Sequence, residues 1–258
     1  MSPAARLLLL SNSTASGFPY LQLWAKTIMS FLGLTVKHVL FVPFAGVTLD
    51  WDEYTSRVQT ALPELTVTGI HRVPDMAAAV AAADVLMVGG GNTFHLLSHL
   101  HQHNLSEAMS ERVLAGVPYI GWSAGSNVAA PDIGTTNDMP VVWPDRAEAL
   151  NLIPFNLNPH YSNWKPPGYQ GEGRDDRLNE AILVKKRTIV ALSEGVGLRA
   201  ENQSVTVIKS GPEQRPPESR LEVRIWKPLP TAPFFHVVDV PTDQPDQEFL
   251  LDPFLIGP

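Results

Sequence analysis

Hydrophobic residues are grouped in short continuous runs along most of the chain. Runs of this length, without regular polar alternation, are typical of strands that are buried on both faces of a sheet. They predict strands at RLLLLS from Arg6, HVLFVPF from His38, LTVTGI from Leu65, DVLMVGG from Asp84, VPYIGWS from Val117 and RTIVALSE from Arg187.

Segments with helical character lie between these runs. The clearest is NLSEAMSERVLAG, where Asn104 is the expected N-cap, Glu107 follows three residues later and Gly116 ends the helix. Strands that alternate with helices predict an α/β fold, with a doubly wound, mostly parallel sheet and helices on both faces. Ligands of such sheets bind beyond the carboxyl ends of the strands.

The pattern changes after about residue 196. The stretch VGLRAENQSVTVIKS alternates apolar and polar residues around a Glu-Asn-Gln turn, which predicts an antiparallel hairpin at a sheet edge, and RLEVRIW from Arg220 predicts one more strand. Prolines then recur at positions 228, 230, 233, 241, 245 and 253. Because proline disrupts helices and central strands, we expect residues 1–228 to form a single domain and 229–258 a Pro-rich tail outside the sheet.

Composition narrows the classes of function. The chain has 258 residues, a formal net charge of -7 and 44% hydrophobic residues, enough for a sizeable core. Nucleic-acid binding draws on Lys and Arg, so the acidic balance speaks against it. Cysteine is absent, which excludes disulfides, thiolate metal sites and a cysteine nucleophile. The leucine run near the N-terminus is too short for a signal peptide, and no run approaches the ~20 apolar residues of a membrane span, so we expect a cytoplasmic protein without membrane contact.

The sequence GWSAGSN at residues 121–127 is the first chemical motif. Ser123 lies between Gly121 and Gly125, follows a predicted buried strand and precedes a predicted helix. This strand-turn-helix context is that of a nucleophile elbow, in which the N–H of the next residue, Ala124, can face a developing oxyanion. The alternative is that Ser123 only caps the helix.

The sequence VGGGNTFHLL is the second motif. Its glycines allow backbone N–H groups to approach a ligand closely, but it lacks both the Gly-x-Gly-x-x-Gly spacing and the lysine of nucleotide-binding loops. An oxyanion donor at Gly90 or Gly91 therefore fits better than nucleotide binding, and a simple tight turn is the alternative. Asn92, which follows the glycines, is assigned to substrate binding.

A serine nucleophile needs a base, and the chain has eight histidines. The helical series at 95, 99 and 103 lacks the His-Glu-x-x-His pattern of a zinc site, so we interpret it as a packed or solvated helix face and expect no metal. His160, directly after Pro159, is one of several plausible bases. Asp138 and Glu194 both follow predicted strands, and the residues alone do not decide which one orients the base.

Two arginines suggest a binding site for an anion. Arg174 precedes a helix expected to begin near Asp175, where the helix dipole disfavours a cation by roughly 0.3 to 1 kcal/mol. Arg177 shares its helix face, and together the two could receive a carboxylate. The alternative is that Asp175, Asp176 and Glu180 pair with these arginines in solvent.

Several of these segments together resemble peptidase E, the α-aspartyl dipeptidase family. The matching pieces lie in the order VGGGNTFHLL, PYIGWSAGSNVAAPDIGTTNDMP, LNLIPFNLNPHY, GEGRDDR and LSEG, and the resemblance covers roughly residues 5 to 210. It implies a fold like that of class I glutamine amidotransferases, with serine in place of their cysteine. It also implies cofactor-free hydrolysis of dipeptides with N-terminal aspartate through an acyl-enzyme.

The resemblance also implies roles for individual residues. Ser123 would be the nucleophile and His160 the base, while the third member has been read in this family as either Glu194 or Asp138. We favour Glu194 as the partner of His160, with Asp138 shaping the site or binding the substrate amine. The match at Arg174 supports recognition of the aspartyl carboxylate. The tail has no counterpart in the shorter family members.

Two other functions remain open at this point. One is a cyanophycinase-like or other serine exopeptidase for acidic peptides on the same fold, which activity on β-linked Asp-Arg compared with Asp-Leu would separate. The other is a non-catalytic sensor of an acidic metabolite, since a fold alone does not define function. The expected partner is a small acidic dipeptide, and a homodimer is one option for the assembly.

Overall fold

The computed structural model describes residues 2, 4–211, 221–241, 249–252 and 255. The elements follow one another in the order β1 (Leu7–Leu10), α1 (Ala25–Leu32), β2 (His38–Val42), α2 (Trp51–Ala61), β3 (Thr66–Gly69), the 3-10 helix η1 (Ile70–Arg72), α3 (Met76–Ala82), β4 (Leu86–Val88), α4 (Thr93–Gln102), α5 (Leu105–Leu114), β5 (Tyr119–Trp122), α6 (Ala124–Asn127), β6 (Asn156–Asn158), α7 (Arg174–Lys185), β7 (Ile189–Leu192), β8 (Val196–Glu201), β9 (Ser204–Lys209), β10 (Val223–Pro228), β11 (Phe235–Val240) and β12 (Phe249–Leu250).

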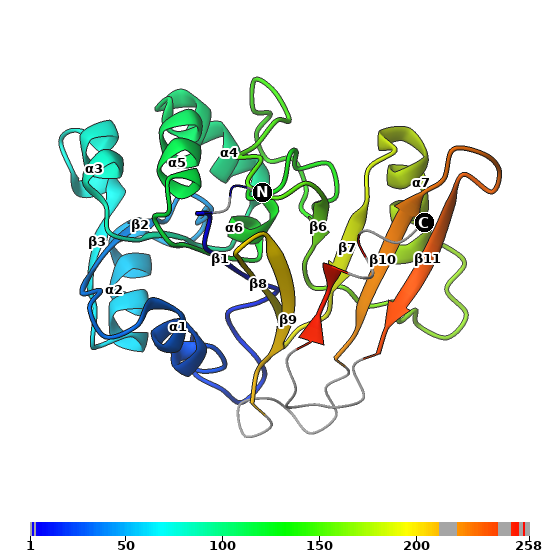
Figure 1. Cartoon of the computed structure of the whole chain (residues 1–258), viewed down its shortest axis with the longest axis horizontal. Coiled ribbons are helices and arrows are strands. Elements are labelled where there is room, and N and C mark those ends of the chain that lie inside the picture. The colour runs from blue at the N-terminus through cyan, green and yellow to red at the C-terminus, as the bar shows by residue number, and fades with distance from the viewer. Residues whose placement is uncertain (1, 3, 212–220, 242–248, 253–254, 256–258) are drawn as a thin grey trace.

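The larger sheet has the strand order β12-β9-β8-β1-β5-β4-β2-β3. The five strands from β1 to β3 in this order are parallel to their neighbours, and β8, β9 and β12 extend the sheet with antiparallel pairs. Figure 1 shows α1 and α2 on one side of this sheet and α3, α4 and α5 on the other. The predicted doubly wound, mostly parallel α/β fold is thus confirmed.

The alternation of side chains along β1 shows how the two faces are filled. Leu7 and Leu9 belong to the core that includes the apolar residues of α3, α4 and α5, whereas Leu8 and Leu10 belong to the core beneath α1 and α2. All four leucines are fully buried. A continuous apolar run is therefore required here, because a strand covered by helices on both faces has no solvated side.

The six predicted strands are all present, but one strand and one helix start differ from the prediction in detail. β3 is the edge strand, and its threonines at 66 and 68 are exposed, so it is not buried on both faces. The helix predicted after Asn104 is α5, but the Asn104 side chain makes no capping hydrogen bond. Asn104 instead has left-handed backbone angles (φ 54°, ψ 36°), because the chain must reverse within two residues of the end of α4.

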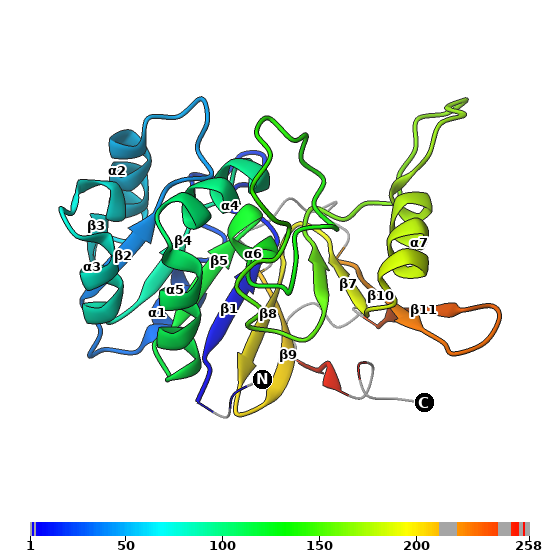
Figure 2. The same ribbon diagram turned by 90° about the horizontal axis from the view of Figure 1, so that it is seen from above.

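A second, smaller sheet has the order β11-β10-β7-β6 and lies beside the first (Figure 2). β6 and β7 are parallel, whereas β7, β10 and β11 pair antiparallel. Helix α7 covers this sheet by packing Leu178 and Ile182 against β7 and Trp226. The predicted hairpin is confirmed as β8 and β9, and the strand predicted from Arg220 is β10.

The prediction that the Pro-rich segment 229–258 lies outside the sheets is wrong for two stretches. β11 pairs with β10 over residues 235–240, and β12 pairs with β9 at residues 249–250. The prolines at 233 and 241 flank β11 rather than interrupt it, and both new strands are edge strands, where proline nearby is tolerated. Residues 242–248 of this segment lie outside the described residues.

A membrane-spanning element was not expected. Across the described part of the chain, no helix combines the length and the apolar character that crossing a bilayer requires.

Candidate active site

Three of the predicted site residues, Ser123, His160 and Glu194, lie together at the carboxyl ends of strands from both sheets. Ser123 directly follows β5 of the larger sheet, while His160 and Glu194 each lie two residues beyond β6 and β7 of the smaller one. This is the edge at which open α/β sheets bind ligands. Two sheets thus contribute to one site.

Ser123 is half-buried and has the backbone geometry of a sharp turn. Its backbone angles are φ 52° and ψ −113°, a region that residues other than glycine rarely adopt. The flanking glycines are sterically required, since a Cβ at Gly121 would lie 2.4 Å from the Gly125 oxygen and one at Gly125 would lie 2.1 Å from the Val88 oxygen. Although Ser123 is the N-cap of α6, its side chain makes no capping bond, so the helix-cap interpretation is not supported.

The side chain of Ser123 instead belongs to a linear chain of hydrogen bonds. Its Oγ lies 2.9 Å from His160 Nε2, and His160 Nδ1 lies 3.0 Å from Glu194 Oε1. The side chains of His160 and Glu194 are 40% and 59% exposed, so the arrangement is open to solvent. A carboxylate on one imidazole nitrogen and a hydroxyl on the other allow proton transfer from the hydroxyl.

Two buried residues that the sequence analysis missed hold this arrangement in place. Ser11 Oγ accepts a hydrogen bond from the His160 N–H (2.9 Å) and donates one to the Leu192 oxygen (2.9 Å). Asn12 Oδ1 accepts the N–H of Gly195, next to Glu194, at 2.9 Å. Both follow β1 directly, so polar residues at the end of a buried strand were the available signal.

The glycine turn between β4 and α4 lies against the nucleophile. A Cβ at Gly90 would be only 3.0 Å from Ser123 Cβ. The flanking N–H groups of Gly89 and Asn92 donate to backbone carbonyls at 3.1 and 2.8 Å. Among the described residues, those of Gly90 and Gly91, and likewise that of Ala124, have no acceptor. These unpaired donors next to Ser123 suit an anionic oxygen.

Asp138 does not contact His160 and is therefore not its partner in this structure. Its Oδ2 accepts three hydrogen bonds, from Thr93 N (2.8 Å), Thr93 Oγ1 (2.5 Å) and Thr136 Oγ1 (3.0 Å). Asn92 has a similar structural role, because its Oδ1 accepts a hydrogen bond from the His95 N–H and its Nδ2 donates one to the Met139 oxygen. Asp138 and Asn92 together fix the N-terminus of α4 and the loop beside it.

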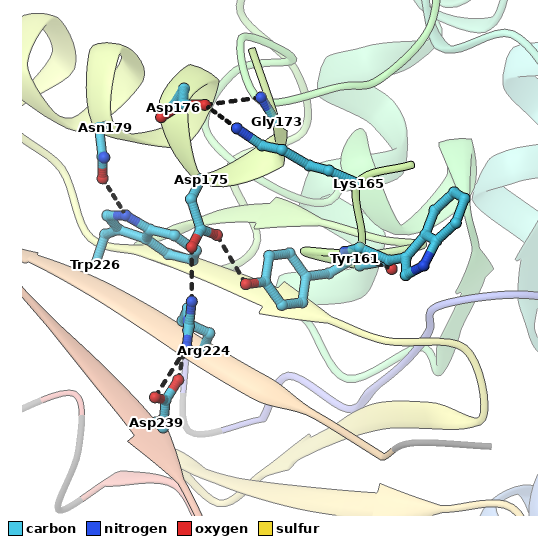
Figure 3. A network of polar contacts seen from close by, with 11 residues as sticks. Tyr161, Lys165, Gly173, Asp175, Asp176, Asn179, Arg224, Trp226 and Asp239 are labelled. Atoms are coloured by element: carbon cyan, nitrogen blue, oxygen red, sulfur yellow. Dashed lines mark hydrogen bonds and ion pairs between the residues drawn. The ribbon is translucent and has the colours of Figure 1, made fainter. Parts of the chain in front are cut away.

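Arg174 is the first residue of α7, which begins one residue earlier than expected, and two of the predicted acidic partners, Asp175 and Asp176, bind elsewhere. Asp175 accepts hydrogen bonds from Tyr161 Oη (2.8 Å) and Arg224 (2.7 Å), and Asp176 pairs with Lys165 (2.8 Å), as Figure 3 shows. The Arg174 Nη1 is buried without a hydrogen-bond partner among the described residues. Burial, followed by repulsion from the exposed Arg177, lowers the pKa of Arg174.

Two cavities adjoin the site. One of about 710 Å³ opens beside Glu194 and is lined by residues that include Tyr161, Trp164, Lys165, Glu222 and Arg224. The other, of about 420 Å³, is lined by the glycine turn and by residues that include Tyr20, Leu49 and Tyr54. One cavity thus lies beside Glu194 and the other beside the glycine turn.

The histidine series on α4 is packed, in agreement with the sequence prediction. His99 contacts the rings of Phe44 and Trp51, with centroids 5.2 Å apart in both cases, and His95 Nδ1 bonds the Phe44 oxygen. Within the described ranges, no group of three or more His, Asp or Glu residues is arranged to hold a metal ion.

Comparison with known sequences defines the class and then the family. Related proteins are named Peptidase E: that of Shewanella denitrificans is 45% identical over 208 residues, which are 80% of this chain and 88% of the relative, and that of Salmonella typhimurium is 46% identical over 199 residues (76% and 86%). The chain is therefore a peptidase. Residues 7–208 match the model of peptidase family S51, and the chain belongs to that family.

Solved structures agree with the fold. A peptidase E protein from Listeria monocytogenes superposes with a TM-score of 0.60 at 23% identity, covering 80% of this chain and 99% of that one. A peptidase from an acI-B1 Actinobacterium gives a TM-score of 0.62 at 13% identity and covers 96% of this chain and 98% of that one. The second match extends over nearly the whole chain, including most of the segment beyond the family model.

Proposed function

We propose that this peptidase is a serine dipeptidase that cleaves dipeptides with an N-terminal aspartate. The observation that carries the proposal is the hydrogen-bonded series Ser123, His160 and Glu194, next to backbone N–H groups that have no acceptor among the described residues. Nucleophile, base and orienting carboxylate in line are the requirements of acyl transfer, and triads are defined by such geometry rather than by chain order.

In the proposed reaction, Ser123 Oγ attacks the carbonyl carbon of the aspartyl residue while His160 Nε2 takes its proton. Glu194 orients the imidazole and stabilises its charged form. The tetrahedral oxyanion is held by the N–H of Ala124 and that of Gly90 or Gly91. His160 then protonates the leaving amine, and the acyl-enzyme is hydrolysed by water that the same imidazole activates.

Selection of aspartate is assigned to Arg174. A buried guanidinium nitrogen without a partner is unfavourable, because desolvation of a polar group is offset only by a hydrogen bond. A substrate carboxylate would supply that partner, and arginine suits the planar carboxylate group. Arg177 is exposed on the same helix and adds positive charge. Asp138 and Asn92 shape the site rather than contact the reacting atoms.

The decisive experiment is hydrolysis of Asp-X, Glu-X and Asn-X dipeptides and of β-linked Asp-Arg by purified protein. We expect release of aspartate from Asp-X only, and loss of several orders of magnitude in rate for Ser123→Ala. Cleavage of β-linked Asp-Arg in preference to Asp-Leu would favour the cyanophycinase-like alternative. Absence of any hydrolysis, or full activity in the Ser123→Ala variant, would contradict the proposal.

A further inference from the structure

A buried tyrosine of α2, Tyr54, is hydrogen-bonded to the glycine turn beside Ser123. Tyr54 is 4% exposed, and its Oη donates a 2.9 Å hydrogen bond to the carbonyl oxygen of Gly90. Its other contacts are accepted bonds, from Trp122 Nε1 at 3.2 Å and from Tyr20 Oη at 3.3 Å. Because a phenol carries one proton, Tyr54 uses its only donor on this turn.

The bond to Gly90 has a consequence for the next N–H group. A trans peptide is planar, so its C=O and N–H point in opposite directions. Fixing the Gly90 carbonyl therefore fixes the direction of the Gly91 N–H, which has no acceptor among the described residues. Gly91 has φ 136°, and a Cβ there would lie 2.3 Å from the Ala45 oxygen, so only glycine fits.

We propose that Tyr54 is a positioning residue of the oxyanion hole, which locks the Gly90–Gly91 peptide so that the Gly91 N–H faces the substrate's carbonyl oxygen. The inference rests on the proposed serine mechanism and selects Gly91 over Gly90 as the second donor beside Ala124. Without the phenol, a peptide between two glycines has no side chain to restrict its rotation. Donors that must reorient during the reaction stabilise the transition state less than donors that are already in place.

The ring and the hydroxyl of Tyr54 have separable contacts. The ring packs edge-to-face against Phe41, with centroids 5.0 Å apart, and against Tyr20 at 6.2 Å. Only the hydroxyl reaches the Gly90 carbonyl. Burial raises the pKa of Tyr54, so the phenol keeps the proton that it donates. Replacement by phenylalanine therefore removes the bond to Gly90, together with the two bonds that the hydroxyl accepts, and retains the ring packing.

The test compares Tyr54→Phe with Thr55→Val, a control that removes a neighbouring hydroxyl of α2, whose bond goes to the Trp51 oxygen, and leaves the bond between Tyr54 and Gly90. With Asp-Leu as substrate, we expect Tyr54→Phe to lower kcat about 10- to 100-fold, somewhat less than complete removal of an oxyanion donor. KM should stay within about twofold, and both constants of Thr55→Val should stay within about twofold of wild type. Rates are expressed per folded molecule, with thermal unfolding as the check of folding.

A second readout separates positioning from general loosening of the site. An aldehyde analogue of aspartate forms a hemiacetal with Ser123 whose oxygen occupies the oxyanion position, whereas free aspartate does not. We expect the Ki of the aldehyde to rise in Tyr54→Phe by the factor lost in kcat, and the Ki of aspartate to stay constant. Equal weakening of both inhibitors, or an unchanged kcat, would overturn the role of Tyr54. An inactive wild type would instead overturn the proposed function itself.

Discussion

At the scale of single residues, the backbone of the proposed triad is strained. Ser123 and His160 have φ values of 52° and 53°, a conformation that costs an L-amino acid about 1–3 kcal/mol. The surrounding contacts hold them there: Ser11 binds the His160 N–H, and the two glycines around Ser123 allow the sharp turn. The result is that both side chains meet at hydrogen-bonding distance.

The structure separates the two carboxylates that the sequence left as alternatives. Glu194→Gln should lower kcat for Asp-Leu by roughly 10²- to 10⁴-fold, because a neutral amide no longer stabilises the imidazolium form of His160. Asp138→Asn, measured beside it, should keep kcat within about tenfold and lower the free energy of unfolding by about 0.5–2 kcal/mol, since Asp138 Oδ2 accepts the N–H of Thr93, the first residue of α4. The reverse pattern would return the triad to Asp138.

The specificity of Arg174 has its own test. Arg174→Met keeps an unbranched apolar stem and removes the charge, so kcat/KM for Asp-Leu should fall about 10- to 100-fold, as expected for one lost charged hydrogen bond. Asn-Leu, which lacks the carboxylate, should lose much less. Arg177→Met removes an exposed charge on the same helix and should lower kcat/KM for Asp-Leu by less than about threefold. A constant ratio of the two specificity constants in Arg174→Met would show that this residue does not recognise the aspartyl group.

At the scale of elements, α7 and β10 are joined by one arginine. Arg224 of β10 binds Asp175 in the first turn of α7 and also Asp239 of β11, and it lies over the Tyr161 ring at 5.9 Å (Figure 3). Tyr161 is the neighbour of His160, and Asp175 is the neighbour of Arg174. A strand beyond the family model thus supports both the base and the proposed specificity residue.

Arg224→Met should therefore act on both stability and substrate binding. Losing hydrogen bonds between partly buried charged groups should lower the free energy of unfolding by about 1–3 kcal/mol, and a less fixed Arg174 should raise KM for Asp-Leu several-fold. Arg57→Met is the control, because its i,i+4 pair with Glu53 lies on the surface and is expected to contribute only about 0.3–0.5 kcal/mol. Thermal unfolding and steady-state kinetics measure both effects. Equal behaviour of the two variants would rule out a supporting role for Arg224.

At the scale of the whole molecule, the C-terminal segment completes both sheets. Removing residues 229–258 deletes β11 and β12 and, among the described residues, the buried apolar side chains of Val240 and Leu251. We expect the free energy of unfolding to fall by at least about 3 kcal/mol, in the range of large core truncations, and aggregation to increase at the exposed strand edges. A chain that ends at residue 255 keeps both strands and should behave as wild type. Unchanged thermal stability of the shorter chain would contradict this.

Much of the larger sheet could be predicted from the sequence, because continuous apolar runs such as those at Leu7–Leu10 and Tyr119–Trp122 specify strands covered on both faces. The motif around Ser123 was recognisable for a similar reason: only glycines at 121 and 125 permit the close backbone contacts of that turn. Steric limits and hydrophobic periodicity depend on residues that are close in the sequence, so they can be recognised from a short segment alone.

The partnerships between distant segments were decided only by the tertiary structure. From the residues alone His160 was one of several plausible bases until β6 placed it beside Ser123, and they did not decide between Asp138 and Glu194 until Asp138 proved to be bonded to Thr93. The edge pairing of β11 and β12 could not be predicted from the sequence either. A short strand near prolines pairs only if the fold places an unpaired sheet edge beside it. Contacts across more than 30 residues follow from how the elements pack, which no local pattern encodes.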